Sequence, residues 1–338
     1  EYEKAELLLQ EYCLKHGSDP ESFYLLGQAL AQRGRFGDAE TAFRKVISVQ
    51  PGTAVAYGSL GSVLRRLRRF PEAVEVLQKA CEILPRDKVY RLDLIECLEH
   101  AGRRQDAFQE CHQLLEKNPD FGLGYAALAT LCFCAQQYGD AIENYRLALE
   151  HSPDLLDARV GLGKVYTAVG ERALARQQYQ TVLKEKPDHV ESIAGIAVLH
   201  ERSGELDQAY RKIQRVIDMG YHHTTIANAY VNICDRFDDC AGAVQYAETT
   251  LESLADDVRW ERKVLHFTLG RRYDKMGEYD KAFGHYQQAN SQFPVNYDSA
   301  AHADVVTGII KTFSPAYMMS APRASIQSTR PVFIVGMP

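Results

Sequence analysis

The last residues of the chain have the pattern of an anion-binding loop. Val332–Val335 is an uninterrupted run of β-branched and aromatic side chains, which is typical of a strand buried on both faces. Gly336 follows, and glycine lets a backbone approach a ligand closely. A strand, a glycine loop and a helix N-terminus together form a recurrent phosphate cradle. The sequence therefore predicts a strand and the start of such a loop here.

Cysteine and histidine could supply other chemistry, but their spacing does not favour it. None of the eight cysteines forms a C-x-x-C pair, so we expect reduced thiols that fill small gaps in the core, with a metal site or a disulfide as the alternative. His222 and His223 are adjacent, yet no Cys, Asp or Glu shares their spacing, and we expect solvated loop histidines. No metal site is predicted. The cysteines are Cys13, Cys81, Cys97, Cys111, Cys132, Cys134, Cys234 and Cys240.

Composition excludes two classes of partner. The 338 residues are 46% hydrophobic and 25% charged, with a net charge of −6 and no basic tract, which argues against nucleic acid. The longest apolar run, near Ile193–Leu199, is far too short to cross a bilayer. We expect a cytoplasmic protein. Glu1 falls in the middle of a repeat, so we expect a chain trimmed at its start, and a lost targeting segment remains an alternative.

The elements that would position these residues are repeated. Alanines followed by an amphipathic run recur every 34 residues, and prolines follow the same interval. The next alanine, Ala282, comes after 39 residues, which indicates a five-residue insertion. The alanines are Ala5, Ala39, Ala73, Ala107, Ala141, Ala175, Ala209 and Ala243, and the prolines are Pro51, Pro85, Pro119, Pro153 and Pro187.

Each period predicts two helices joined by a tight turn. In LGQALAQRGRFGDAETAFRKVISVQP, Gly34 ends the first helix because glycine tolerates a left-handed cap. Ala39 lets the second helix approach closely, and Phe43 and Val46 continue its apolar face. Pro51 stops the second helix.

This 34-residue pattern resembles the tetratricopeptide repeat. The resemblance implies an all-α, right-handed α-solenoid over residues 1–296, with a half repeat (Glu1–Gly17) and about eight full repeats. First helices would line a concave groove. Repeats three and seven are the most degenerate. The only tryptophan, Trp260, is expected to be a hydrophobic prop for the bend at the insertion, with a ligand platform as the alternative. The repeats are predicted to begin near Pro20, Ala54, Lys88, Gly122, Leu156, Val190, Thr224 and Lys263.

The repeat register places polar and aromatic side chains in the groove, where an extended peptide or protein segment could bind. A clamp for a peptide carboxylate is disfavoured because repeat seven lacks its lysine, and no asparagine recurs at one position in many repeats. A mixed polar surface that is merely solvated is the alternative. The candidates are Arg65, Glu96, Phe133, Lys164, Arg202, Asn228, Asn232 and Arg271.

Residues 297–327 are predicted to form a capping helix and a linker. Asp298 can cap a helix over residues 299–312, whose apolar positions have helical spacing and would cover the last repeat. Pro315 and Pro322 then interrupt regular structure. The predicted strand and loop occupy residues 328–338.

The stretch RPVFIVGMP, with the preceding helix and Phe-Ser-Pro, is similar to the opening strand of PAPS-dependent sulfotransferases that follow a tetratricopeptide array. The resemblance implies a parent protein that transfers a sulfuryl group from PAPS to a hydroxyl. It implies that Gly336 and Pro338 begin the phosphosulfate loop, while the remaining loop and the base lie beyond Pro338. The chain alone would then bind no cofactor and be inactive. The array would recruit substrate or mediate self-association. The alternative is a stand-alone scaffold that binds a peptide and has no enzymatic domain.

Overall fold

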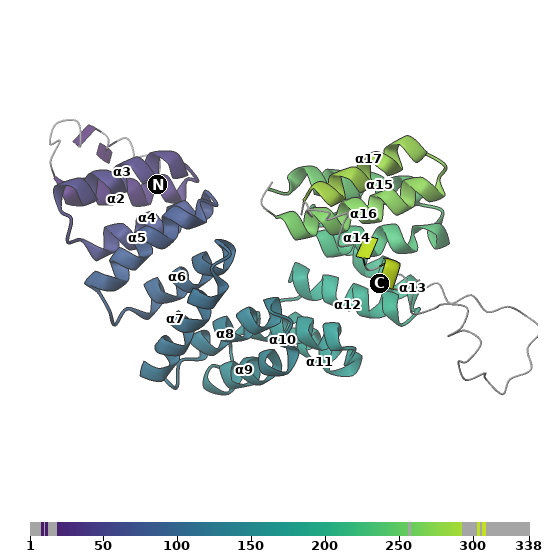
Figure 1. Cartoon of the computed structure of the whole chain (residues 1–338), viewed down its shortest axis with the longest axis horizontal. Coiled ribbons are helices and arrows are strands. Elements are labelled where there is room, and N and C mark those ends of the chain that lie inside the picture. Colours follow the sequence, from purple (N-terminus) through teal and green to yellow (C-terminus); the bar gives the residue numbers. More distant parts are fainter. Residues whose placement is uncertain are drawn as a thin grey trace, which may run out of the picture. The chain divides into compact units, whose positions relative to one another are not determined.

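The computed structural model describes residues 8, 9, 11, 12, 19–255, 258–292, 303, 304 and 306–308. All of its regular elements within these residues are helices, and none is a strand (Figure 1). The chain divides into two units, Glu1–Ala289 and Asn290–Pro338.

The first unit is a row of helix pairs. The first and second members of the pairs are α2 (Pro20–Gln32) and α3 (Phe36–Val49), α4 (Ala54–Arg66) and α5 (Phe70–Ile83), α6 (Lys88–His100) and α7 (Arg104–Lys117), α8 (Gly122–Cys134) and α9 (Tyr138–His151), α10 (Leu156–Val169) and α11 (Arg172–Glu185), α12 (Val190–Arg202) and α13 (Leu206–Asp218), α14 (Thr224–Ile233) and α15 (Cys240–Ser253), and α16 (Arg259–Lys275) and α17 (Tyr279–Ser291).

The turn within each pair is left-handed and follows the repeat interval. The residues with positive φ include Gly34 at 76° and Gly170 at 89°, and they recur every 34 residues even where the position is not glycine, as at Gln136 with φ of 61°. A residue with left-handed backbone dihedrals ends the first helix and reverses the direction of the chain, so the second helix can pack against the first. The remaining members of the series are Arg68, Gly102, Gly204, Asp238 and, after the insertion, Gly277.

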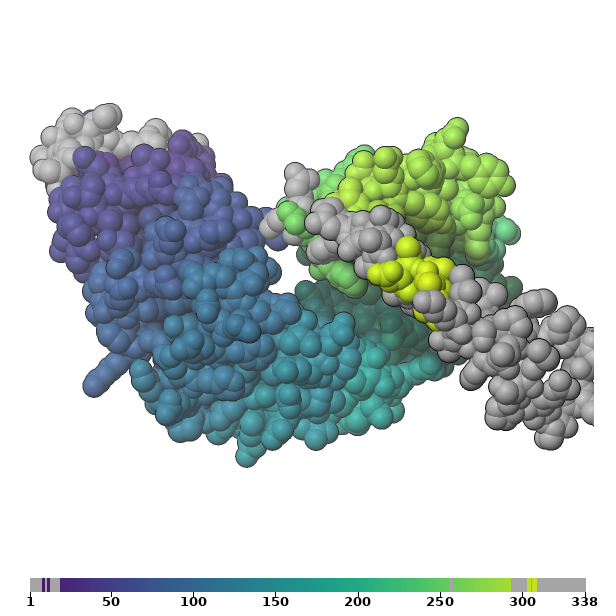
Figure 2. Space-filling view, viewed as in Figure 1, coloured from purple at the N-terminus to yellow at the C-terminus, as the bar shows by residue number. Residues whose placement is uncertain are grey.

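Small residues on the first helices admit large side chains from the second helices. A Cβ atom on Gly27 would lie 2.7 Å from the ring of Phe43. Tyr179, on α11, is wedged between two neighbouring pairs, since a Cβ atom on Gly163 or on Gly195 would lie 2.7 Å or 2.4 Å from its ring. The first helix of one pair also contacts the first helix of the next, as α12 does with α14 and α14 with α16. Figure 2 shows these consecutive segments packed side by side in the order of the sequence.

One prediction about repeat eight needs correction, and repeat seven has a feature that the sequence analysis did not predict. The last first helix, α16, begins at Arg259 rather than near Lys263, because the end of the inserted segment extends the helix by four residues. Helix α14 is short and continues as a 3-10 helix, η1 (Cys234–Phe237). The other seven full repeats begin where the sequence predicts.

The described residues of the second unit include Ala303, Asp304 and Val306–Gly308, which are helical. The remainder of the predicted capping helix, the predicted strand Val332–Val335, and the cofactor-loop residues Gly336 and Pro338 lie outside the described residues. In the part of the chain that is described, no helix combines the length and the apolar character needed to cross a membrane.

Candidate functional site

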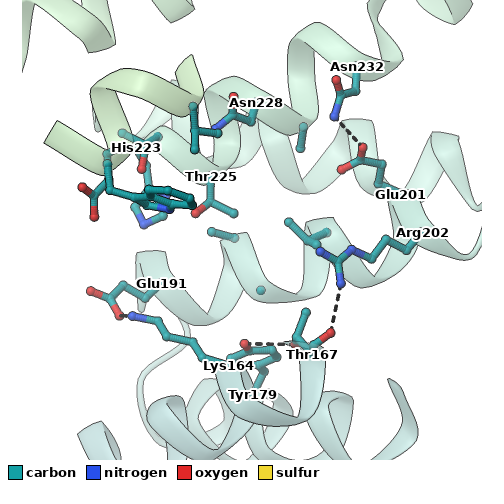
Figure 3. Close-up of a pocket in the computed structure, with 18 residues that line it drawn as sticks. Lys164, Thr167, Tyr179, Glu191, Glu201, Arg202, His223, Thr225, Asn228 and Asn232 are labelled. Atoms are coloured by element: carbon teal, nitrogen blue, oxygen red, sulfur yellow. Dashed lines mark hydrogen bonds and ion pairs between the residues drawn. The ribbon is translucent and has the colours of Figure 1, made fainter. Parts of the chain in front are cut away.

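A pocket of about 700 Å³ opens on the surface that is formed by the first helices of repeats five to eight. Helices α10, α12, α14 and α16 each contribute side chains to it, and the short turn before α14 adds His223 (Figure 3). Because the repeats stack side by side, residues that are one or two periods apart in the sequence face one another across this pocket. We call it the first-helix pocket.

One wall carries an ion pair between neighbouring repeats. The Nζ atom of Lys164 on α10 lies 2.7 Å from the Oε2 atom of Glu191 on α12. Partial burial of the Glu191 carboxylate would raise its pKa, but the hydrogen bond and charge of Lys164 outweigh this effect and hold the pKa below its ordinary value. Both side chains are about half exposed, so a charged ligand can reach either partner.

Two further contacts tie the helices together across the pocket. Asn232 on α14 donates a hydrogen bond of 2.9 Å from Nδ2 to Oε1 of Glu201 on α12. Burial of the Glu201 carboxylate raises its pKa, and this amide opposes the rise only in part. Arg202 donates a hydrogen bond of 2.9 Å from Nη1 to the backbone carbonyl of Thr167. The polar groups of these residues are therefore largely used within the protein.

Two polar atoms at the rim of α14 have no hydrogen-bond partner among the residues that the structure describes. These are the Oδ1 atom of Asn228 and the Nδ1 atom of His223, and both are buried from solvent. Burial also lowers the pKa of His223, which keeps its imidazole neutral near pH 7. An unsatisfied buried polar atom costs about 1–3 kcal/mol, so a ligand that hydrogen-bonds to these two atoms recovers that cost.

Trp260 gives the pocket an exposed aromatic surface. Its side chain is 63% exposed and lies at the pocket beside Glu261 and Val264, with the Nζ atom of Lys263 5.8 Å from the ring centroid. The prediction that Trp260 is a hydrophobic prop is therefore wrong, since such a residue would be buried. His222 is exposed in its loop, as predicted, whereas His223 in the same loop is only partly exposed and its Nδ1 atom is buried.

The structure brings half of the predicted groove residues together. Lys164, Arg202, Asn228 and Asn232 all line the first-helix pocket. The pocket also contains Glu191, which the sequence did not single out, and His223 and Trp260, which the sequence singled out but did not place in the groove. The irregular sequence around repeat seven and the insertion was the available signal, but the exposure of these side chains depends on how α14 and α16 are placed.

The other four candidates lie elsewhere. Arg65 forms an ion pair with Glu96, and Arg65 lines a second pocket between α2, α4 and α6. Phe133 packs against the core with its ring centroid 6.0 Å from that of Tyr138. The nearest described polar contact of Arg271 is to Thr268 on its own helix, at 3.5 Å.

Comparison with known proteins identifies the helix pairs. A family model described as tetratricopeptide repeat matches residues 24–88, and a second model of the same description matches residues 135–191. The helix pairs are tetratricopeptide repeats. No curated protein matches the chain.

Several solved structures share the arrangement of helices. A tetratricopeptide repeat protein from Parabacteroides merdae superposes with a TM-score of 0.60 at 16% identity, over 74% of this chain and 98% of that one. A chain of the APC/C hetero-tetramer Cut9-Hcn1 gives 0.57 at 15% identity, over 89% and 72%. The human IFIT1 dimer with m7Gppp-AAAA gives 0.57 at 16% identity, over 86% and 77%. At these identities the likeness shows the fold alone.

Proposed function

We propose that the array is a protein-interaction module and that the first-helix pocket binds an extended segment of another polypeptide. The observation that supports this proposal is the pair of buried atoms, Asn228 Oδ1 and His223 Nδ1, that have no partner in the described part of the chain and lie beside the exposed ring of Trp260. An extended chain presents a backbone N–H and a carbonyl at every residue, so it can donate to Asn228 Oδ1 while a side chain covers the tryptophan ring.

The electrostatics favour a segment of mixed charge. Lys164 and Glu191 compensate each other and stay accessible, so the pocket offers both signs within a few ångströms. An exposed ion pair of this kind contributes at most about 1 kcal/mol to stability. Breaking it to form new ion pairs with a ligand therefore costs little free energy. We expect a peptide with an acidic residue to pair with Lys164, a basic residue to pair with Glu191, and an aromatic or aliphatic residue to cover Trp260.

The test is a selection of peptides from a displayed random library, followed by calorimetric titration of the best binder. Replacement of Asn228 by Leu removes the unpartnered acceptor and should weaken binding about tenfold, the equivalent of about 1.4 kcal/mol. Arg271→Ala, on α16 but outside the pocket, is the matched control and should leave Kd unchanged. If Asn228→Leu binds as tightly as the unaltered chain, the peptide binds somewhere else.

The finer part of the proposal is that the array serves a PAPS-dependent sulfotransferase, as the sequence of Arg330–Pro338 suggests by resemblance. In that arrangement the array recruits acceptor substrate or associates with a second copy, and PAPS binds in the downstream domain of a cytoplasmic protein. A stand-alone array with no enzymatic domain accounts for the first-helix pocket equally well. The coding sequence after Pro338 discriminates between them, because the sulfotransferase arrangement requires Arg-Ser-Gly-Thr-Thr there.

An activity measurement complements the coding sequence. The 338-residue chain should not sulfate an acceptor above a no-protein control, whereas the parent with its downstream domain should. Sulfation by the chain alone would contradict the assignment of the phosphosulfate loop to the residues after Gly336.

A further inference from the structure

Two cysteines that are six positions apart meet at the end of helix α14. The Sγ atom of Cys234, the first residue of η1, lies 2.6 Å from the Sγ atom of Cys240, the first residue of α15. Both are free thiols, Cys234 buried and Cys240 partly exposed. The turn that connects them contains Asp238 with φ of 51°, which reverses the chain and brings the two sulfurs together.

The environment of the pair gives its members different roles. Burial raises the pKa of Cys234 to about 12, and the single proton of its thiol can be donated either to the carbonyl of Val231 at 3.3 Å or to the Sγ atom of Cys240. Cys240 lies at a helix N-terminus, and Nη1 of Arg272 from the next repeat is 3.5 Å from its sulfur. The Cys240 thiol also donates to Oδ1 of Asp235 at 3.3 Å, and Cys240 is the more accessible of the two cysteines, so a disulfide from solution reaches it first.

Arg272 also argues against a metal ion at this position, although Asp235 adds a third ligand atom near both sulfurs. The guanidinium of Arg272 is buried and donates to both carboxylate oxygens of Asp235, one of them at 2.9 Å, and to the carbonyl of Val231 at 2.8 Å. It already supplies the positive charge that a metal cation would bring, and a cation beside it would be repelled.

We propose that Cys234 and Cys240 are a dithiol site for reversible oxidation to a disulfide, with a low-molecular-weight disulfide such as oxidised glutathione as co-reactant. Cys240 gives its proton to solvent, and its sulfur attacks one sulfur of the glutathione disulfide. That bond breaks, and one glutathione thiolate leaves and takes up a proton. A mixed disulfide on Cys240 results.

The second step closes the protein disulfide. Cys234 gives its proton to solvent and attacks the sulfur of Cys240, which displaces the second glutathione as a thiolate that is protonated in turn. Two protein thiols and one glutathione disulfide become one protein disulfide and two glutathione thiols, so the protein loses two electrons and glutathione gains them. The proximity of the two sulfurs makes the second step intramolecular and fast compared with a second attack from solution.

The test equilibrates the folded chain in buffers with different ratios of reduced to oxidised glutathione, blocks the remaining thiols by alkylation, and examines tryptic peptides by mass spectrometry. Arg236 lies between the two cysteines, so trypsin places Cys234 in the peptide of residues 216–236 and Cys240 in that of residues 237–259. A disulfide between them joins these two peptides. We expect the joined pair to increase as the oxidised fraction of glutathione increases, and to disappear on return to reduced glutathione.

Three variants check the roles. Cys234→Ser should accumulate the glutathione adduct on Cys240, because the second step is removed. Cys240→Ser should leave Cys234 unmodified, because that thiol is buried. Cys134→Ser removes an exposed cysteine elsewhere and should leave the joined peptides unchanged.

Two outcomes would overturn the proposal. One is that no joined pair forms at glutathione ratios that place adducts on Cys134, or that it forms only after denaturation. The other is that zinc alone protects both thiols of the pair from alkylation while oxidised glutathione joins nothing, which would make the cluster a metal site. Both readouts come from the unaltered chain, so they do not depend on the folding of any variant.

Discussion

At the scale of single residues, burial decides which polar groups change their chemistry. His266 on α16 is 6% exposed, and its Nδ1 atom lies 3.0 Å from the Nδ1 atom of His285 on α17. Burial lowers the pKa of His266 to about 4, and the charges of His285 and Arg262 add to this effect. Burial lowers the pKa of His285 as well. The pair is therefore stable only in its neutral form.

The consequence is a loss of stability in acid. Above about pH 6.5, the ordinary pKa of histidine, both the folded and the unfolded states are neutral at this site and its stability is fully present. Between that pH and about pH 4 only the unfolded state binds the proton. The folded state is therefore destabilised as the pH falls, by up to about 3 kcal/mol from His266.

The measurement is thermal unfolding of the last repeats between pH 7.5 and pH 4.5, followed by the fluorescence of Trp260 on the same helix. We expect His266→Gln, which keeps a polar group but cannot titrate, to flatten the dependence of Tm on pH. Parallel profiles for the two proteins would contradict this assignment. His151→Gln, a change at a histidine in another repeat, is the control and should keep the slope.

At the scale of helices, the repeats are joined by large side chains that fill the space left by small ones. Tyr179 is 2% exposed, and its ring occupies the space beside Gly163 in its own pair and Gly195 in the next. Its hydroxyl lies 3.3 Å from Oγ1 of Thr167, which also lines the first-helix pocket. One side chain therefore couples two repeats and supports the floor of the pocket.

Tyr179→Ala should lower the free energy of unfolding by about 3–5 kcal/mol, the range for deletion of a large buried aromatic side chain. The reason is that Gly163 and Gly195 have no side chains to fill the cavity that the ring leaves. Tyr179→Phe keeps the ring and loses only the hydroxyl contact, so it should cost about 1 kcal/mol. Urea unfolding followed by circular dichroism measures both. Similar costs for the two variants would mean that the hydroxyl, not the ring, couples the repeats.

At the scale of the whole array, each helix pair contacts its neighbouring pairs and little else. Stability and binding can therefore be assigned to separate groups of repeats. The first-helix pocket uses only α10, α11, α12, α14 and α16 with the turn before α14. Among the described residues, repeats one to four contribute no side chain to it. This separation is a property of solenoids, in which distant parts of the sequence seldom meet.

A fragment of residues 122–292 should therefore stay helical and bind the selected peptide with a Kd within about threefold of that of the full chain, whereas a fragment of residues 20–186 should stay helical and not bind. Circular dichroism and calorimetry check the two properties separately. A helical 122–292 fragment without affinity would show that repeats one to three take part in binding.

The sequence by itself determined the helix pairs and where seven of the eight full repeats begin. Glycine at the turn, alanine at the close contact and proline at the end act through the local backbone, and so they can be recognised from spacing alone. The tertiary structure decided which polar side chains converge. Lys164 meets Glu191 across a repeat boundary, His223 is partly buried in the turn before α14, and Cys234 meets Cys240 where α14 is followed by a 3-10 helix. Helical periodicity gives the face of a side chain, whereas its partners and its burial depend on the distance between successive helices, and this distance changes where the repeat pattern is irregular.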